Sequence, residues 1–127
     1  MELAEIVERA EKAYRSGVVP RRCNYGVNVY PGKPFTATGG GCCGVSAAAI
    51  GLTIPSDISL DKGPIHLFLT VLEISDMQYH SFCWGFDNNP GPDKRERDWD
   101  DLNAWWQAGR DLANRWSKEM EWNLLKL

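Results

Sequence analysis

Two adjacent cysteines that follow three glycines are the most reactive side chains that this sequence places together. Cys42 and Cys43 come directly after Gly39–Gly41, and small apolar residues typical of a short buried helix follow them. The start of a helix lowers the pKa of a thiol, so either cysteine is a candidate nucleophile. His66 and His80 are the two histidines of the chain that could act as its base. One hypothesis is therefore thiol catalysis centred on Cys42, Cys43 and His80.

A second arrangement resembles a metal site. His80, Cys83 and Asp87 are spaced so that they would share one side of a helix, and imidazole, thiolate and carboxylate are zinc ligands. The chain has no Cys-x-x-Cys pair, however, and adjacent cysteines do not easily face one ion. Free cysteines are also among the most buried residue types, where they pack as small apolar side chains. We therefore expect packed, reduced cysteines, no metal and no cofactor.

Two residues are candidates for binding rather than chemistry. Trp122 falls on the polar side of the expected last helix, and an exposed tryptophan is a good interface anchor. A neighbouring loop that covers the indole is the alternative. Asp87 ends an apolar helix and opens a polar loop. Residues 87–91 faintly resemble a calcium loop, but a proline and a lysine then stand where further ligands are needed, so calcium is rejected.

These residues must be positioned by elements that the hydrophobic pattern indicates. Residues 18–41 contain three prolines and five glycines around a β-leaning piece, which predicts a short hairpin or an irregular loop. Elsewhere apolar residues recur at three- and four-residue steps or form short apolar runs. We predict helices over 2–16, 42–52, about 64–72, 76–87 and 98–125.

The predicted helix over 76–87 is apolar nearly all round, so we expect it to be the most buried element. Ser75 and Gln78 precede and open it with the spacing of a capping box. Gly109 lies in the middle of the apolar stripe of the last helix, where glycine costs about 1 kcal/mol relative to alanine. Something must offset that cost, and we expect a close helix–helix crossing at Gly109.

Composition excludes the extreme classes of protein. The chain has 127 residues, of which 43% are hydrophobic, and this favours a single domain over 1–127 with a mainly α fold, a compact bundle of four or five helices. Its 14 basic and 17 acidic residues argue against a nucleic-acid partner bound by bulk charge. The charged N-terminus is unlike a secretory signal, and the apolar runs are shorter than a membrane span. We expect a cytoplasmic protein without a membrane partner.

Three segments together resemble a family of short uncharacterised proteins from bacteria and their phages. The segments are GGGCCGVSAAAIG, LEIS and FCWGFDNN, and the resemblance covers about residues 40–116. This chain departs from the family at residues 44–46, where the family often has Pro-Leu-Gly, and at Asn88, where it has glycine. The resemblance implies a mainly helical fold and no particular activity. The matching positions are Cys42, Cys43, Ala47, Leu72, Ile74, Ser75, Gly85, Phe86 and Asp87.

The absence of a recognised catalytic motif, the mild net charge of -3 and the aromatic content favour binding over chemistry. We expect a small accessory or interaction protein that binds a host macromolecule, such as a protein partner, or a small ligand. The family resemblance suggests an association with a phage or mobile element. The alternative is a metal- or thiol-dependent enzyme centred on Cys42, Cys43 and His80.

Overall fold

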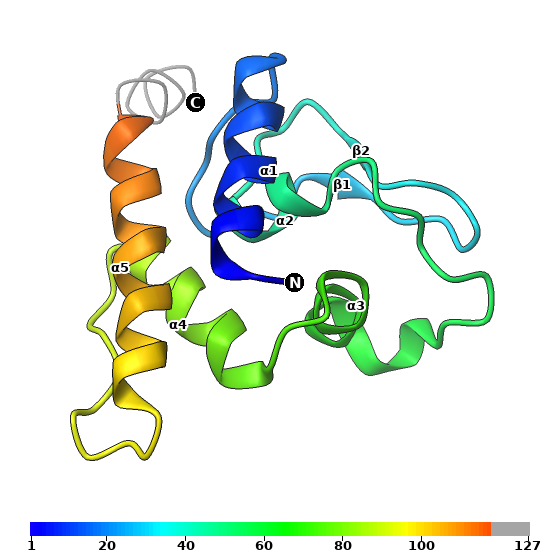
Figure 1. Ribbon diagram of the computed structural model, residues 1–127. Helices are drawn as coiled ribbons and strands as arrows, with labels where there is room; N and C mark the ends of the chain where they lie inside the picture. The colour runs from blue at the N-terminus through cyan, green and yellow to red at the C-terminus, as the bar shows by residue number, and fades with distance from the viewer. Residues whose placement is uncertain (118–127) are drawn as a thin grey trace.

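The computed structural model describes residues 1–117, and within them the chain is mainly α-helical, as predicted (Figure 1). A two-stranded antiparallel sheet accompanies the helices. Helices α4 and α5 lie on one side of α1 and α2, whereas α3 and the hairpin lie on the other. The elements in chain order are α1 (Leu3–Arg15), β1 (Val27–Asn28), β2 (Thr36–Ala37), α2 (Gly44–Ala49), the 3₁₀ helix η1 (Leu60–Lys62), α3 (Gly63–Leu72), α4 (Asp76–Phe86) and α5 (Trp99–Arg115).

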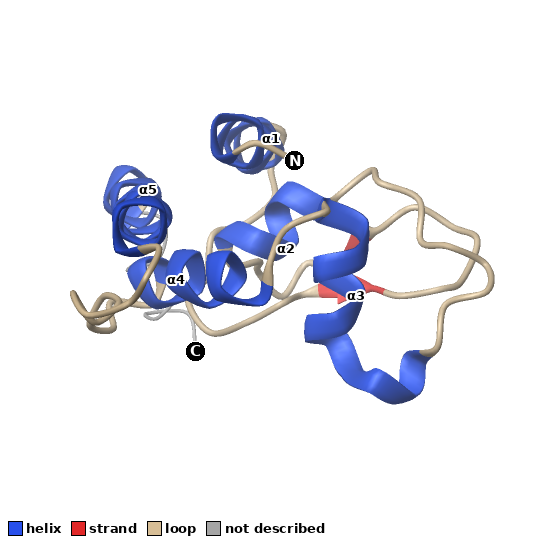
Figure 2. Ribbon diagram, turned by 60° about the horizontal axis from the view of Figure 1, so that its bottom comes forward, coloured by secondary structure: helices blue, strands red, loops and turns tan. Residues whose placement is uncertain are grey.

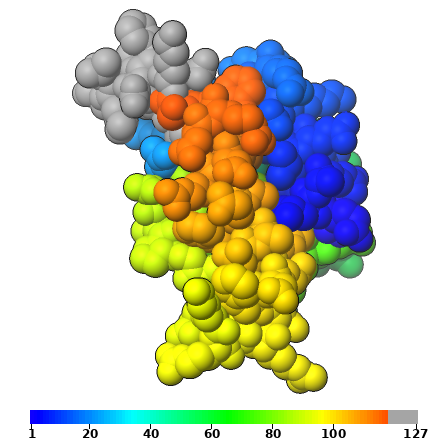
Figure 3. Space-filling model, turned by 60° about the vertical axis from the view of Figure 1, so that its left-hand side comes forward, coloured from blue at the N-terminus to red at the C-terminus, as the bar shows by residue number. Residues whose placement is uncertain are grey.

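Helix α1 forms where the periodicity predicts it and buries one side. Ile6, Ala10, Ala13 and Tyr14 are its buried residues, one stripe of an amphipathic helix. The Tyr14 hydroxyl donates to the carbonyl oxygen of Cys42 at 2.9 Å and thereby links α1 to the start of α2. Figure 3 shows α1 beside α5 on one face of the molecule. The Tyr14 ring also packs on Trp116, just after α5, with 5.3 Å between ring centroids.

The most buried helix is α2, so the prediction that α4 would be the most buried element is wrong. All six residues of α2 are buried, whereas α4 leaves Met77, Cys83 and Trp84 half-buried. The reason is that α2 contacts all four of the other α-helices (Figure 2). Its alanines and glycine are small enough for those neighbours to enclose it. A prediction based on the number of large apolar side chains therefore underestimates the burial of a helix that consists mostly of small residues.

Helices α4 and α5 cross at two glycines, as Gly109 predicts. A Cβ atom on Gly109 would clash with the carbonyl oxygen of Phe82. A Cβ atom on Gly85 would clash in the same way with the carbonyl oxygen of Trp106. The two helix backbones are therefore in direct contact, and this contact offsets the low helix propensity of glycine. The compensation is backbone packing rather than an aromatic ring over the glycine.

The proline- and glycine-rich segment forms the predicted small hairpin. Val27 pairs with Ala37 across β1 and β2. Just before β2, the backbone N–H of Phe35 donates to the carbonyl oxygen of Leu52 at 3.0 Å. The Phe35 ring is buried and stacks on Phe68 of α3, with 5.5 Å between centroids. The buried Phe35 ring thus anchors the hairpin to the core, and the half-buried side chains of Val27 and Val29 pack against the same core.

The capping box predicted at the start of α4 is present. Gln78 N–H donates to the Ser75 hydroxyl at 3.1 Å, and the Gln78 side-chain oxygen accepts from Ser75 N–H at 3.0 Å. We expect Ser75→Ala to lower the free energy of unfolding by about 1 kcal/mol, because a backbone donor at the helix start loses its partner. Urea unfolding measures this. Ser59→Ala is the control, because Ser59 precedes η1 without a side-chain cap; an equal loss there would contradict the assignment.

Helix α5 spans Trp99–Arg115 and confirms the first part of the helix predicted over 98–125. The part of that range from residue 118 onward lies outside the described residues. The candidate binding residue Trp122 lies outside the described residues. Among residues 1–117 no helix combines the length and apolar character that crossing a bilayer requires.

Candidate functional site

The four cysteines are free thiols that gather around the start of α2 and the end of α4. Cys42 and Cys43 are buried at the start of α2. Cys83 is half-buried one turn before the end of α4. Cys23 is exposed in the loop before β1, with its backbone in the left-handed region at φ 56°.

Burial makes the two adjacent thiols of Cys42 and Cys43 poor nucleophiles. The Cys42 thiol donates to the carbonyl oxygen of Gly26 at 3.4 Å, and the Cys43 sulfur lies 3.5 Å from the Ser46 hydroxyl. Removal from water raises the pKa of Cys42 to about 11 and also raises the pKa of Cys43. These shifts are opposite in direction to the lowering expected at a helix start. The loss of hydration outweighs the dipole of a helix of only six residues.

Cys83 and Asp87 lie close to Cys43, Tyr25 and Tyr79, and these five residues form a cluster next to the loop before β1. Burial is the main cause of the raised pKa of Cys83, and the neighbouring Cys43 and Asp87 add to it. The backbone N–H of Cys23 donates to a carboxylate oxygen of Asp87 at 2.9 Å and ties the loop to the end of α4. Asp87, expected as a binding residue, therefore makes a contact within the chain. The Tyr25 and Tyr79 hydroxyls share a short hydrogen bond at the edge of this cluster.

His80 lies apart from the thiols. Its Nε2 atom is 3.4 Å from a carboxylate oxygen of Asp76, and its ring stacks on Trp84 with 5.8 Å between centroids. His66 lies on α3, where its carbonyl oxygen accepts a hydrogen bond from Thr70. Within the described residues neither imidazole is hydrogen-bonded to a cysteine. The structure therefore brings Cys43 towards Cys83 and Asp87, and it does not bring His80 to any thiol.

A metal site does not emerge from this cluster. In residues 1–117 no three side chains from His, Cys, Asp and Glu are arranged so that they could hold one ion. His80 and Cys83 lie on neighbouring turns of α4, and Asp87 caps its C-terminal end. The imidazole nevertheless faces Asp76, whereas the carboxylate binds the loop at Cys23.

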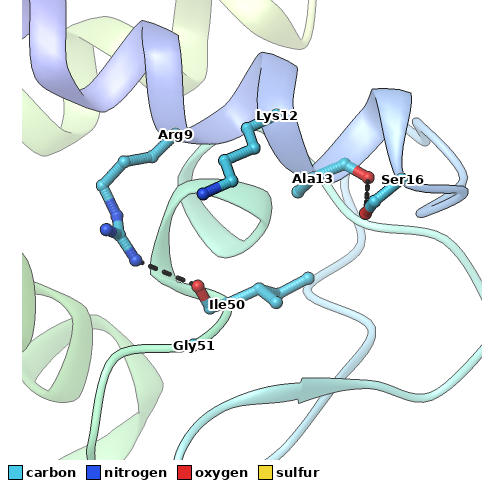
Figure 4. Close-up of a pocket in the computed structure, with 6 residues that line it drawn as sticks. All are labelled: Arg9, Lys12, Ala13, Ser16, Ile50 and Gly51. Carbon is cyan, nitrogen blue, oxygen red and sulfur yellow. Dashed lines mark hydrogen bonds between the residues drawn. The ribbon is translucent and has the colours of Figure 1, made fainter.

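A pocket that the sequence did not indicate lies between α1 and the end of α2 (Figure 4). Its volume is about 400 Å³. Arg9 and Lys12 of α1, and Ser16 at its C-terminal cap, line the pocket from one side of the helix, at positions three and four residues apart. That side is polar, and a polar side of a helix is normally read as facing solvent. The pocket exists only because the turn after α2 lies opposite it. The lining residues are Arg9, Lys12, Ala13, Ser16, Ile50 and Gly51.

Arg9 is held firmly at one end of this pocket. Its Nε atom donates to the carbonyl oxygen of Ala48 at 2.7 Å, and its Nη2 atom donates to that of Ile50 at 3.0 Å. These carbonyls belong to the C-terminal end of α2, which carries partial negative charge. The guanidinium is half-buried and forms no ion pair with any described carboxylate. Lys12 is exposed and likewise forms no ion pair within residues 1–117.

A second hollow, of about 390 Å³, lies between the start of α4 and the start of α5. Four of its nine lining residues are acidic, namely Asp76, Glu96, Asp98 and Asp101, and one, Arg97, is basic. Here the amide of Gln78 already donates to Asp101 at 3.2 Å and bridges the two helices. The two hollows thus differ in the sign of the charge that they present.

Comparison of the chain with protein-family models, with curated proteins and with solved structures finds no match.

Proposed function

We propose that this protein is a small accessory protein that acts by binding, without chemistry, a small ligand or a protruding group of a partner macromolecule in the pocket between α1 and α2. The observation that carries the proposal is this pocket, with its fixed Arg9. Its volume falls in the range of about 300–1,000 Å³ that is typical of small-ligand sites. A pocket with a fixed polar group at its wall can orient a ligand, which supports specific binding.

The thiol- or metal-dependent enzyme is the alternative, and the geometry supports it less well. A nucleophilic thiol needs a lowered pKa and a base within hydrogen-bond reach. Burial instead raises the pKa values of Cys42 and Cys43, and His80 interacts with Asp76 and Trp84. At neutral pH both thiols therefore stay protonated in the folded protein.

The partner class, the location and the phage association that we propose are supported mainly by the sequence. The net charge of -3 favours a protein or small-molecule partner over nucleic acid. A cytoplasmic location is part of the proposal, and it is supported by the four free cysteines, which suit a reducing compartment. Association with a phage or mobile element rests on the family resemblance alone, which is carried by the segments around Cys42-Cys43, Leu72–Ser75 and Gly85–Asp87.

The test is a fragment screen followed by ¹H–¹⁵N correlation spectra. We expect bound fragments to shift the amide signals of Ala13, Ser16 and Gly51 and to be recovered unchanged. Lys12→Trp should abolish these shifts, because an indole at this exposed position can fold over the pocket and fill it. Lys62→Trp is the control, since Lys62 is also exposed but does not line the pocket.

Two outcomes would contradict the proposal. Fragments that bind only elsewhere on the described surface, with no shift at Ser16 or Gly51, would remove the pocket as the binding site. A fragment that is recovered chemically modified, with the modification lost in Cys43→Ala, would favour the thiol enzyme instead.

A further inference from the structure

The charge of the α1–α2 pocket is unbalanced. Two of its six lining residues are cationic and none is acidic. Glu11 is the glutamate of α1 that forms ion pairs, and its partners are Arg15 at 3.4 Å and Arg115 at 3.1 Å. Neither pair involves a residue of the pocket. Arg9 and Lys12 therefore face the pocket without an ion-pair partner in the described part of the chain.

Arg9 has unused donors in a fixed position. A guanidinium carries five N–H donors, and two of them are occupied by the carbonyls of Ala48 and Ile50. The other three donate to no described residue. Because one edge of the group is already held, little side-chain entropy is lost when a ligand binds the remaining donors. The group is thus ordered in advance for an acceptor with two oxygens.

Lys12 reaches the same pocket from one turn further along α1. Figure 4 shows its ammonium group directed into the space between Arg9 and Ile50. A purely structural role for Arg9, as a donor to the last carbonyl oxygens of α2, explains its two hydrogen bonds. That role explains neither the presence of Lys12 nor the pocket of about 400 Å³ beside it. A half-buried guanidinium also costs free energy when no opposite charge compensates it. An anion in the pocket would supply that charge.

We infer that the ligand of this pocket carries a carboxylate or phosphate group that Arg9 and Lys12 bind together. This inference rests on the proposed function and narrows its ligand class. The fixed guanidinium supplies paired hydrogen bonds to the anionic oxygens, whereas the flexible ammonium supplies charge and adapts to the size of the group.

The test is a titration of the ¹⁵N-labelled protein with inorganic phosphate, succinate and 1,4-butanediol in a non-phosphate buffer at constant ionic strength. Butanediol matches the length of succinate and lacks its charge. We expect saturable shifts at Ser16 and Gly51 with at least one of the two anions. Butanediol should bind at least about tenfold more weakly than that anion, because hydrogen bonds to charged groups are stronger than those between neutral groups. A response to phosphate alone or to succinate alone supports the inference and identifies the group.

Variants separate this site from general attraction to a basic surface. Lys12→Met should weaken anion binding about tenfold, the loss expected for one charge-assisted contact. Lys62→Met removes an equal charge outside the pocket and should leave the affinity unchanged. Equal anion binding by Lys12→Met and the parent would overturn the inference. Neutral fragments that bind in the pocket while both anions fail would overturn it too, but would leave the proposed function standing. Failure of both ligand kinds would overturn both.

Discussion

Replacing Gly109 by leucine is expected to lower the free energy of unfolding by about 3 kcal/mol or more, at the upper end of what overpacking costs. A Cβ atom at this position meets the carbonyl group of Phe82, and it lies 3.1 Å from the backbone nitrogen of Phe86. Backbone atoms cannot rotate aside as a side chain can, so α4 and α5 must separate. Leucine is a better helix former than glycine by about 1 kcal/mol, so helix propensity alone would raise the stability. A loss of stability can therefore be assigned to the close contact between α4 and α5.

Urea unfolding followed by circular dichroism measures this effect. Ala104→Leu is the matched control, because Ala104 lies on the exposed side of α5 and receives the same side chain without a neighbour to displace. We expect its stability to stay within about 0.5 kcal/mol of the parent. A Gly109→Leu variant that unfolds at a higher urea concentration than the parent would show that the two helices do not touch here.

The crossing at Gly109 was predictable because its signal is local. A glycine inside an apolar stripe is costly wherever the helix packs, so its presence alone indicates a close neighbour. The capping box at Ser75 and Gln78 is equally local, since both partners lie within four residues. The greater burial of α2 was not predictable in this way. It depends on four helices that reach α2 from distant parts of the chain.

The candidate site shows the same limit. Arg9 contacts carbonyls 39 and 41 residues further along the chain, and no helical period in α1 encodes that contact. The two cations of the pocket, Arg9 and Lys12, could be recognised as lacking an ion-pair partner only from the tertiary structure. Similarly, the spacing of His80 and Cys83 indicates that they are neighbours on one helix. It leaves open whether the imidazole contacts Cys83 or contacts Asp76 and Trp84, which also lie one turn away on the same helix. The burial of the Cys83 thiol depends on residues from other parts of the chain.

We expect the protein to lose stability steeply as the pH rises above about 8.5, the ordinary pKa of a thiol in an unfolded chain. Burial raises the pKa of Cys42 to about 11 and also raises the pKa values of Cys43 and Cys83. Below the unfolded pKa both states keep their protons, and the stability is fully present. Above it the unfolded chain releases protons that the folded chain retains, so unfolding is favoured by about 1.4 kcal/mol per pH unit for each thiol.

Three such thiols give a loss of about 4 kcal/mol per pH unit once the unfolded thiols ionise, which is large against the usual stability of about 5–15 kcal/mol. Urea unfolding in the presence of a reductant, at pH 7.5, 8.5 and 9.5, measures the slope below the pKa of about 10 at which tyrosines in the unfolded chain ionise. Cys83→Ala should reduce the slope by about a third, because one of the three protons is removed. Cys23→Ala should change it much less, because the Cys23 thiol is exposed.

A stability that stays flat between pH 7.5 and 9.5 would contradict this expectation and would also bear on function. It would mean that the thiols ionise as easily in the folded protein as in the unfolded chain. Cys42 and Cys43 would then regain the reactivity that a nucleophile needs, and the thiol enzyme would become the better hypothesis. The expected steep loss instead ties the cysteines to packing, because a thiol that destabilises the fold when it ionises is held in the folded protein as an uncharged, apolar group.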